Sequence, residues 1–150
     1  MSSFSIRAAR TSDIDSIIEL AVESVTTVDP LPVTIDQGAM RDMAKSMIGV
    51  ATQFVWVAEV DGKVVACVAA TAARGFWFRG WQASMILFWS RVPGAGIALL
   101  RQLAEWIRGR PLIKLAVIEC EPSIDPRALR FLRRLGFTRS STNLVYVRQK

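Results

Sequence analysis

Residues 84–100 read Ser-Met-Ile-Leu-Phe-Trp-Ser-Arg-Val-Pro-Gly-Ala-Gly-Ile-Ala-Leu-Leu. The first six residues form an apolar run typical of a strand, and the residues from Gly96 to Arg108 repeat their apolar side chains with helical spacing. A turn with two glycines, Gly94 and Gly96, joins the two runs. The first N–H groups of a helix lack intrahelical partners, and the helix dipole is positive at that end. The stretch therefore predicts a strand-turn-helix unit whose turn can hold an anion.

The composition indicates one globular domain, residues 1–150, with no membrane span. The longest apolar run, Val64 to Ala73, is ten residues long, whereas a span needs about 20. The chain has no histidine and two cysteines, which excludes a histidine-based triad and the usual zinc sites, so no metal site is expected. Cys67 and Cys120 both lie in strand-like runs, and the N-terminus has no signal-peptide pattern. We therefore expect a cytoplasmic protein with two reduced core cysteines.

The charge is unevenly distributed along the chain. The net charge is +6; residues 1–90 hold 7 Lys/Arg and 9 Asp/Glu, a net −2, and residues 91–150 hold 12 and 4, a net +8. The basic half begins at the glycine turn. This asymmetry favours an acidic ligand, either a nucleotide-like cofactor or a nucleic acid.

Periodicity and turn signals predict a mixed sheet flanked by helices. A helix capped by Thr11 or Ser12 is expected after the first strand, and Asp61-Gly62 is a strong hairpin turn. The expected strands are 4–9, 54–60, 63–72, 82–90 and 111–119, with closing strands at Phe137 and Leu144 to Arg148. The expected helices start near Ile14, near Met40, at Gly96 and at Asp125-Pro126, the last with Gly136 as its C-cap.

The pattern Arg-x-x-Gly-x-Gly from Arg91 to Gly96, opening into Ile-x-Leu-Leu, resembles the acetyl-coenzyme A loop of the GCN5-related N-acetyltransferases (the GNAT superfamily). The order of elements is also similar to that of the family, as are the hairpin at Asp61-Gly62 and the exit Leu135-Gly136-Phe137. The resemblance implies an α/β (α+β) fold, with a mixed, mostly antiparallel central sheet of six to seven strands flanked by about four helices. Leu87-Phe88-Trp89, with Glu105-Trp106, further resembles a bacteriophage or prophage subgroup, which implies a phage protein in the host cytoplasm.

The resemblance implies that acetyl-CoA is the cofactor and that the activity is transfer of an acetyl group to an amine by direct attack on the thioester. The backbone of the strand before the turn would pair with the pantetheine arm, and the N–H groups of the turn would hold the pyrophosphate. Arg91 would add charge-assisted contacts, whereas Pro93 removes one N–H from the turn. The implied cofactor-binding residues are Phe88, Trp89, Ser90, Arg91, Val92, Gly94, Ala95, Gly96 and Asp125.

The catalytic residues of the family are not all present. The run 82–90 contains no carboxylate, Leu132 stands where a tyrosine is frequent, and Asp125 stands where an asparagine is frequent. Glu59 and Glu119 are the substitute candidates for the general base, beside proton transfer through water. Cys120 as an acetyl-carrying nucleophile is a weaker alternative. A catalytically silent binding protein of the same fold, and a basic nucleic-acid-binding protein, are the alternative functions.

The segment Gly75 to Trp81 combines four aromatic side chains with an arginine. It can line an acceptor site, form a homodimer contact, stack nucleic-acid bases, or pack against an edge strand. The acceptor itself is open: a small-molecule amine, a protein N-terminus, a lysine, or an aminoacyl-tRNA.

Overall fold

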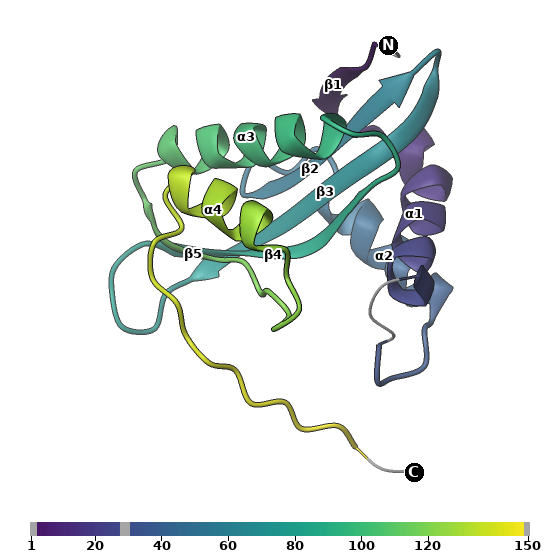
Figure 1. Ribbon diagram of the computed structural model, residues 1–150. Helices are drawn as coiled ribbons and strands as arrows, with labels where there is room; N and C mark the ends of the chain where they lie inside the picture. Colours follow the sequence, from purple (N-terminus) through teal and green to yellow (C-terminus); the bar gives the residue numbers. More distant parts are fainter. Residues whose placement is uncertain (1–2, 28–30, 149–150) are drawn as a thin grey trace.

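A computed structural model describes residues 3–27 and 31–148. Its centre is a sheet in the order β1-β2-β3-β4-β5 (Figure 1). The first four strands pair antiparallel, and β4 pairs with β5 in parallel, so the sheet is mixed and mostly antiparallel as predicted. The strands are β1 (Ser5–Ala8), β2 (Gln53–Val60), β3 (Lys63–Arg74), β4 (Trp81–Ser90) and β5 (Ile113–Val117).

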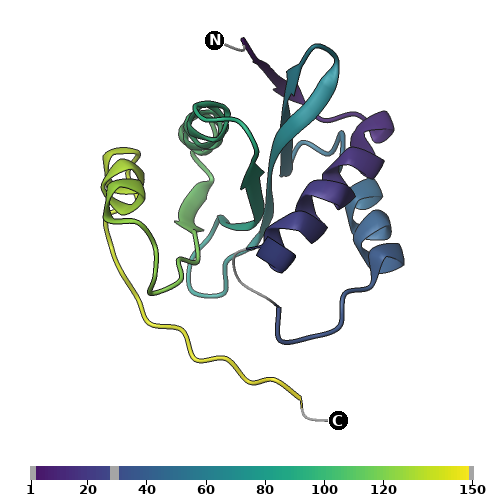
Figure 2. The same ribbon diagram turned by 45° about the vertical axis from the view of Figure 1, so that its right-hand side comes forward.

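Within the described ranges, four α-helices cover the two faces of this sheet (Figure 2). One face carries α1 (Ile14–Thr27), which follows a 3-10 turn at Thr11–Asp13, and α2 (Gln37–Met47). The opposite face carries α3 (Ala95–Arg108), with α4 (Pro126–Arg134) beside it. None of the helices in the described ranges is long and apolar enough to cross a bilayer.

The alternation of side chains along the strands builds a separate core on each face. Between the sheet and α3, Phe54 packs on Trp106, with ring centroids 5.4 Å apart, and Leu99 and Leu103 are fully buried. Between the sheet and α1, Leu20 packs against Val57 and Cys67. The sheet is thus buried on both sides, which explains the long run of small apolar residues in β3.

The sheet has five strands in the described part of the chain, so the prediction of six to seven was wrong. Phe137 and Leu144 to Arg148 are not in strands; residues 138–148 leave α4 in an extended, unpaired path (Figure 1). Leu144 is 96% exposed, and Tyr146, the only tyrosine, is also in solvent. The polar stretch Thr138 to Asn143 supplies no apolar face for docking, and a strand without a partner edge leaves its backbone groups to water.

Two further expectations need correction. Neither Thr11 nor Ser12 caps the first helix; instead Asp13 accepts the Arg10 N–H at 2.7 Å and closes the turn from inside. Cys67 is a buried free thiol as predicted, and burial raises its pKa to about 12, but Cys120 is exposed. Cys120 lies beyond the end of β5, where the chain has already left the sheet, so the core assignment failed.

β4 contains one extra residue relative to β3. Ala69 pairs with Leu87 whereas Ala70 pairs with Met85, which leaves Ile86 as a bulge, half exposed. Because a bulge shifts the alternation by one residue, Met85 and Phe88 both face α3.

Candidate functional site

The glycine turn joins the end of β4 to the start of α3. The Arg91 N–H donates to the Val65 carbonyl at 2.9 Å, which fixes the start of the turn to β3. The Ser90 hydroxyl donates to the Val92 carbonyl at 2.8 Å and accepts from the Val92 N–H at 3.3 Å. Within residues 3–27 and 31–148, no hydrogen bond uses the N–H of Gly94, Gly96 or Ile97. Three donors at a helix N-terminus are therefore free for an anion.

The two glycines serve different needs. Gly94 is the N-cap of α3 and has a φ of +87°, a backbone conformation that L side chains rarely adopt. A Cβ on Gly96 would lie 2.8 Å from Cζ of Phe88 and 3.2 Å from Cβ of Ser90. Gly94 thus shapes the turn, and Gly96 lets the first turn of α3 cross closely over β4.

β4 and β5 separate beside this turn. They pair only from Trp81–Ile113 to Ser84–Val117, so β4 from Met85 to Ser90 has an open edge on that side. Apolar side chains pack together at the divergence, and Leu103 and Ile107 of α3 cover them on one side. The other side chains of this cluster come from the sheet, from the residue after β5 and from the exit of α4: Ala70, Ala83, Met85, Ala116, Val117, Ile118 and Phe137. An open strand edge over an apolar wall suits an extended amide-containing chain.

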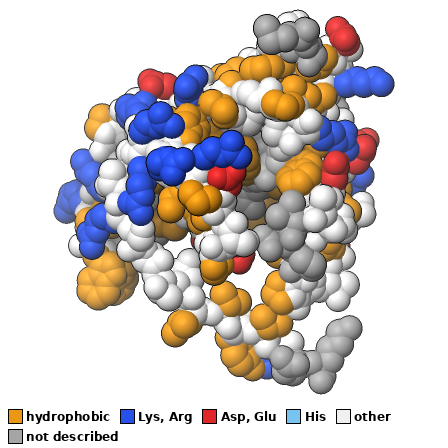
Figure 3. All heavy atoms as spheres, viewed as in Figure 1, with side chains coloured by type: hydrophobic (Ala, Val, Ile, Leu, Met, Phe, Trp, Pro, Cys, Tyr) orange, Lys and Arg blue, Asp and Glu red, His pale blue; other side chains and the backbone are white. Residues whose placement is uncertain are grey.

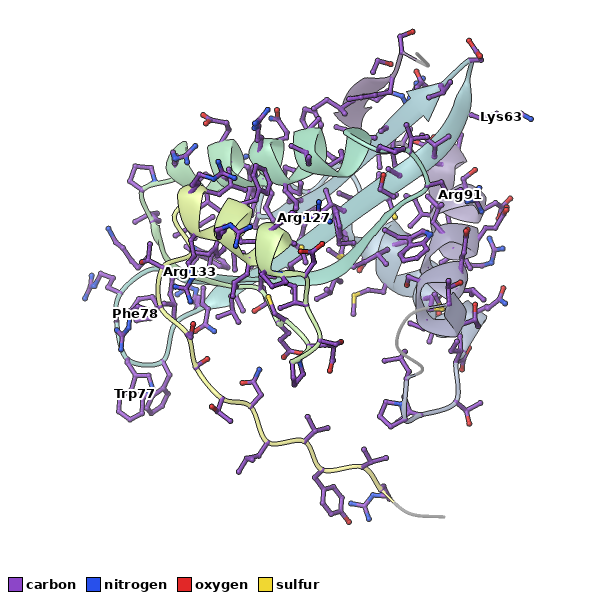
Figure 4. All side chains as sticks on the ribbon, in the orientation of Figure 1. Lys63, Trp77, Phe78, Arg91, Arg127 and Arg133 are labelled. Carbon is purple, nitrogen blue, oxygen red and sulfur yellow. The ribbon has the colours of Figure 1, made fainter. Side chains whose placement is uncertain are left out.

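Arg91 faces α1 rather than the glycine turn (Figure 4). Its guanidinium binds Glu23 at 2.6 Å and Glu19 at 3.0 Å. The hydrogen bond from Arg91 lowers the pKa of Glu23. Any contact of Arg91 with a pyrophosphate must therefore compete with two carboxylates, and that contact stays a prediction.

Glu59, one of the two predicted bases, belongs to an ionic network at the end of β2. Arg7 donates to both oxygens of Asp13, at 2.7 and 3.0 Å, and to Glu59 at 3.2 Å. Asp13 is 6% exposed, and the hydrogen bonds from Arg7 hold its pKa below the usual value. Since the carboxylate of Glu59 is already paired with the Arg7 guanidinium, this arrangement favours a structural role for Glu59 over a role as the general base.

Glu119 and Asp125 lie beyond β5, on the side where the strands separate. Glu119 is exposed and makes no ion pair within the described part of the chain. Asp125 caps α4, as its position before Pro126 indicated: it accepts the Arg127 N–H at 2.8 Å, and this bond lowers its pKa. Cys120 is exposed, and partial burial of its thiol raises its pKa, which disfavours the thiolate that a nucleophile needs.

The structure brings together Phe88, Ser90, Gly94 and Gly96, and it places Glu59 in a separate cluster. Sequence reasoning missed the link from Arg91 to α1, because its partners lie about 70 residues earlier in the chain. It also missed the Arg7–Asp13 pair, although Arg7 and Asp13 follow one another closely around the end of a strand.

The site therefore consists of a glycine turn with free N–H groups beside two parallel strands that diverge. The model of the acetyltransferase (GNAT) family matches residues 27–137. The chain belongs to this family. Its resemblance to the phage subgroup stays a prediction, and a comparison with the curated proteins gives no match.

Solved structures show how widely this GNAT fold is shared. A possible acetyltransferase from Clostridium difficile 630 is 17% identical, with 98% of each chain covered and a TM-score of 0.75. Glucosamine-6-phosphate N-acetyltransferase from Arabidopsis thaliana is 14% identical, with 97% of this chain and 98% of that chain covered and a TM-score of 0.72. An aminoglycoside acetyltransferase from an uncultured soil metagenomic sample is 14% identical, with 98% and 96% covered and a TM-score of 0.67. At these identities the likeness concerns the fold.

Proposed function

We propose that this GNAT chain is an acetyl-CoA-dependent N-acetyltransferase that acts on an amine by direct attack on the thioester. The observation that carries the proposal is the set of free N–H groups at Gly94, Gly96 and Ile97, placed beside the open edge of β4. A diphosphate is the anion that such a set of backbone donors at a helix N-terminus suits. An acyl-pantetheine arm is the extended, amide-containing chain that suits the open edge.

The residues present fit this cofactor. The N–H groups of the turn would bind the diphosphate, and the backbone of Phe88 to Ser90 would orient the arm as an added strand does. When bound, acetyl-CoA would supply an activated acetyl group: the amine nitrogen bonds to the thioester carbon, and the carbon–sulfur bond breaks to release a thiolate, which takes up the proton lost by the amine and leaves as the thiol. Positioning of the amine against this carbon is the main contribution of the protein.

One proton must leave the attacking amine. Glu119 is better placed for this task than Glu59, because it lies at the divergence of β4 and β5 and has no cationic partner in the described residues. The proton passes from the amine to the carboxylate of Glu119, directly or through one water molecule. Glu59 keeps its role in the Arg7 network.

The cofactor assignment is tested with a matched pair, Gly94→Asp and Gly94→Asn. The two side chains have the same shape, and both tolerate a positive φ better than other residues. Asp also favours a helix N-terminus, so the Asp variant should be at least as stable as the Asn variant. Calorimetry should nevertheless show acetyl-CoA binding at least about tenfold more weakly to the Asp variant, because its carboxylate repels the diphosphate. Equal affinities of the two variants would mean that the diphosphate does not bind at this turn.

The catalytic assignment is tested with Glu119→Gln and Glu59→Gln, assayed on a panel of amines and peptides. Glu119→Gln should lower kcat by about a hundredfold while the acetyl-CoA affinity stays unchanged. Glu59→Gln should affect stability more than turnover. Equal, small losses in both variants would show that water alone carries the proton. Cofactor binding without transfer to any tested acceptor would instead favour a silent binding protein, the reading that the missing β4 carboxylate supports.

A further inference from the structure

The end of the sheet opposite the glycine turn carries a second surface, on the hairpin between β3 and β4. The Gly75 N–H donates to the Gly80 carbonyl at 2.9 Å, which closes the hairpin loop. The Trp81 N–H donates to the Leu112 carbonyl at 2.7 Å, so the hairpin lies against the turn that leads into β5. The loop is thus held by backbone hydrogen bonds on both sides.

Two large aromatic side chains stand in solvent on this loop. Phe76 is 87% exposed and Trp77 is 88% exposed, and Trp77 projects away from the body of the protein (Figure 4). Their rings touch edge to face, with centroids 4.8 Å apart and planes at 83°. The pair is therefore preorganised, and each ring keeps a broad face that is free to stack on a ligand. The prediction of edge-strand packing does not hold for these two side chains.

The groups around the aromatic pair are cationic. Arg74 and Arg79 lie on the hairpin, and Arg110 and Lys114 lie on the adjoining turn. The guanidinium groups of Arg74 and Arg110 stack on Trp81 and Trp106, at 5.8 and 4.9 Å from the ring centroids. None of the four has an ion-pair partner among the described residues, and the sequence contains no acidic residue between Asp61 and Glu105. We call these four cations together with Phe76 and Trp77 the basic–aromatic tip.

The positive surface continues from this tip onto the helices. Figure 3 shows basic side chains gathered over α3, α4 and the adjoining end of the sheet. On the two helices, Arg101, Arg130, Arg133 and Arg134 have no carboxylate partner in the described chain, whereas Arg108 and Arg127 pair with Glu105 and Asp125. Fifteen of the 19 basic residues of the chain are arginines, whose planar guanidinium binds phosphate through two hydrogen bonds and stacks on rings.

We propose that the basic–aromatic tip binds single-stranded nucleic acid. Unpaired bases would stack on Trp77 and Phe76, and Arg74, Arg79, Arg110 and Lys114 would contact the phosphates. A duplex hides the faces of its bases, so it cannot use the aromatic pair. The arginines continue from the tip along the helices, and this elongated arrangement suits a linear polyanion. A flat membrane surface would contact only the tip. The glycine turn lies at the other end of the sheet, so this binding does not compete with the cofactor.

The test measures fluorescence anisotropy of labelled oligouridylate and oligothymidylate about 12 nucleotides long, a length within the usual site sizes. Wild type should bind at about 50 mM salt with a slope of log K against log salt near −3, since each of four phosphate contacts contributes about −0.7. Quenching of tryptophan fluorescence by the same oligonucleotides should disappear in Trp77→Phe, because Trp77 is the indole that stands in solvent on the tip.

Three double variants separate the contributions. Phe76→Ala/Trp77→Ala should weaken binding by at least about tenfold at an unchanged salt slope, because it removes stacking and no charge. Arg74→Ala/Arg79→Ala should weaken binding and reduce the slope by about 1.4. The control Arg41→Ala/Lys45→Ala removes the same charge from α2, on the other face of the sheet, and should bind within about twofold of wild type. Acetyl-CoA binding and the melting temperature verify that each variant is folded.

The proposal is overturned if the oligonucleotides do not bind at low salt, or if the α2 control loses as much affinity as the tip variants. It is also overturned if the aromatic variant binds as well as wild type. Binding of phosphatidylserine vesicles without binding of oligonucleotides would assign the tip to a membrane surface instead. A dimer that Phe76→Ala/Trp77→Ala dissociates, without oligonucleotide binding, would assign it to a subunit contact.

Discussion

The two ends of the central sheet carry arginines in opposite circumstances. At the end with the glycine turn, Arg7 is bound by Asp13 and Glu59, and Arg91 by Glu19 and Glu23. At the other end, the four cations of the basic–aromatic tip have no carboxylate partner in the described chain. An arginine with an internal partner ties elements of the fold together, whereas one without a partner is available to an outside anion.

The end with the glycine turn differs in the source of its positive potential, because Arg7 and Arg91 there are both paired with carboxylates. Its positive potential comes from backbone N–H groups at the start of α3, which are fixed in place and need no counter-ion inside the protein. The paired arginines connect the surrounding elements: Arg91 joins the turn to α1, and Arg7 joins β1 to β2. The two ends therefore present two kinds of positive surface, one of backbone dipoles and one of side-chain charges.

The largest expected difference between the ends concerns Asp13. Asp13→Ala removes the nearly buried partner of Arg7 and the acceptor of the Arg10 N–H, so it should lower the free energy of unfolding by about 3 kcal/mol. Arg79→Ala on the tip should change it by less than about 0.5 kcal/mol. Urea denaturation of both variants measures the contrast. Similar values for the two would show that pairing does not distinguish the two ends.

A smaller difference is expected between the glycines of the two ends. Gly96→Ala should destabilise the fold by about 1 kcal/mol, because its Cβ meets the ring of Phe88 although alanine favours a helix. The cost should shrink in a Phe88→Leu background, since the obstacle is one side chain. In Gly80→Ala, the new Cβ would lie 2.6 Å from the carbonyl oxygen of Leu112, and the φ of +142° is itself unfavourable for alanine. Truncating the neighbouring Lys114 should therefore not reduce the destabilisation. Urea denaturation of two double-mutant cycles, Gly96 with Phe88 and Gly80 with Lys114, measures the coupling free energies. Equal coupling in the two cycles would contradict the expectation that only the first clash can be relieved.

The smallest effect is a pH dependence at the glycine-turn end. Arg7 lowers the pKa of Asp13 in the folded state, so the ionised carboxylate stabilises the fold above its unfolded pKa of about 3.9. This contribution is lost as the pH falls through the folded pKa. The stability difference between wild type and Asp13→Asn should therefore narrow from neutral pH to about pH 3. A difference that stays constant over this window would mean that the carboxylate charge does not contribute.

Much of this molecule follows from local sequence. The hairpin at Asp61-Gly62 forms, with φ of +50° and +78°, because aspartate and glycine tolerate that backbone. α3 begins at Ala95, one residue before the predicted start. The agreement is close because the glycine turn leaves few other positions at which the helix could begin. The turn around Gly94 lies between a strand and a helix as predicted, and its role in binding the cofactor stays a proposal.

The features that sequence did not show depend on distant partners. Cys120 is exposed because it lies beyond the end of β5, and Leu144 to Arg148 are unpaired because the chain does not return to the sheet after α4. An apolar run in the sequence does not by itself show whether it pairs with a strand edge. Likewise, nothing in the spacing of Glu59 shows that Arg7 neutralises it. Candidate bases could therefore be named from sequence but not ranked.

The extra residue at Ile86 has a consequence for mutational tolerance. Because it shifts the alternation of β4, it turns Phe88 and Ser90 toward α3 and Trp89 toward α1. Deleting this single residue would exchange those faces and place an indole beneath Gly96, where even a methyl group is crowded. Side chains at this position can vary, since Ile86 is half exposed, but the number of residues cannot. Along β4 the chain should accept substitutions far more readily than insertions or deletions.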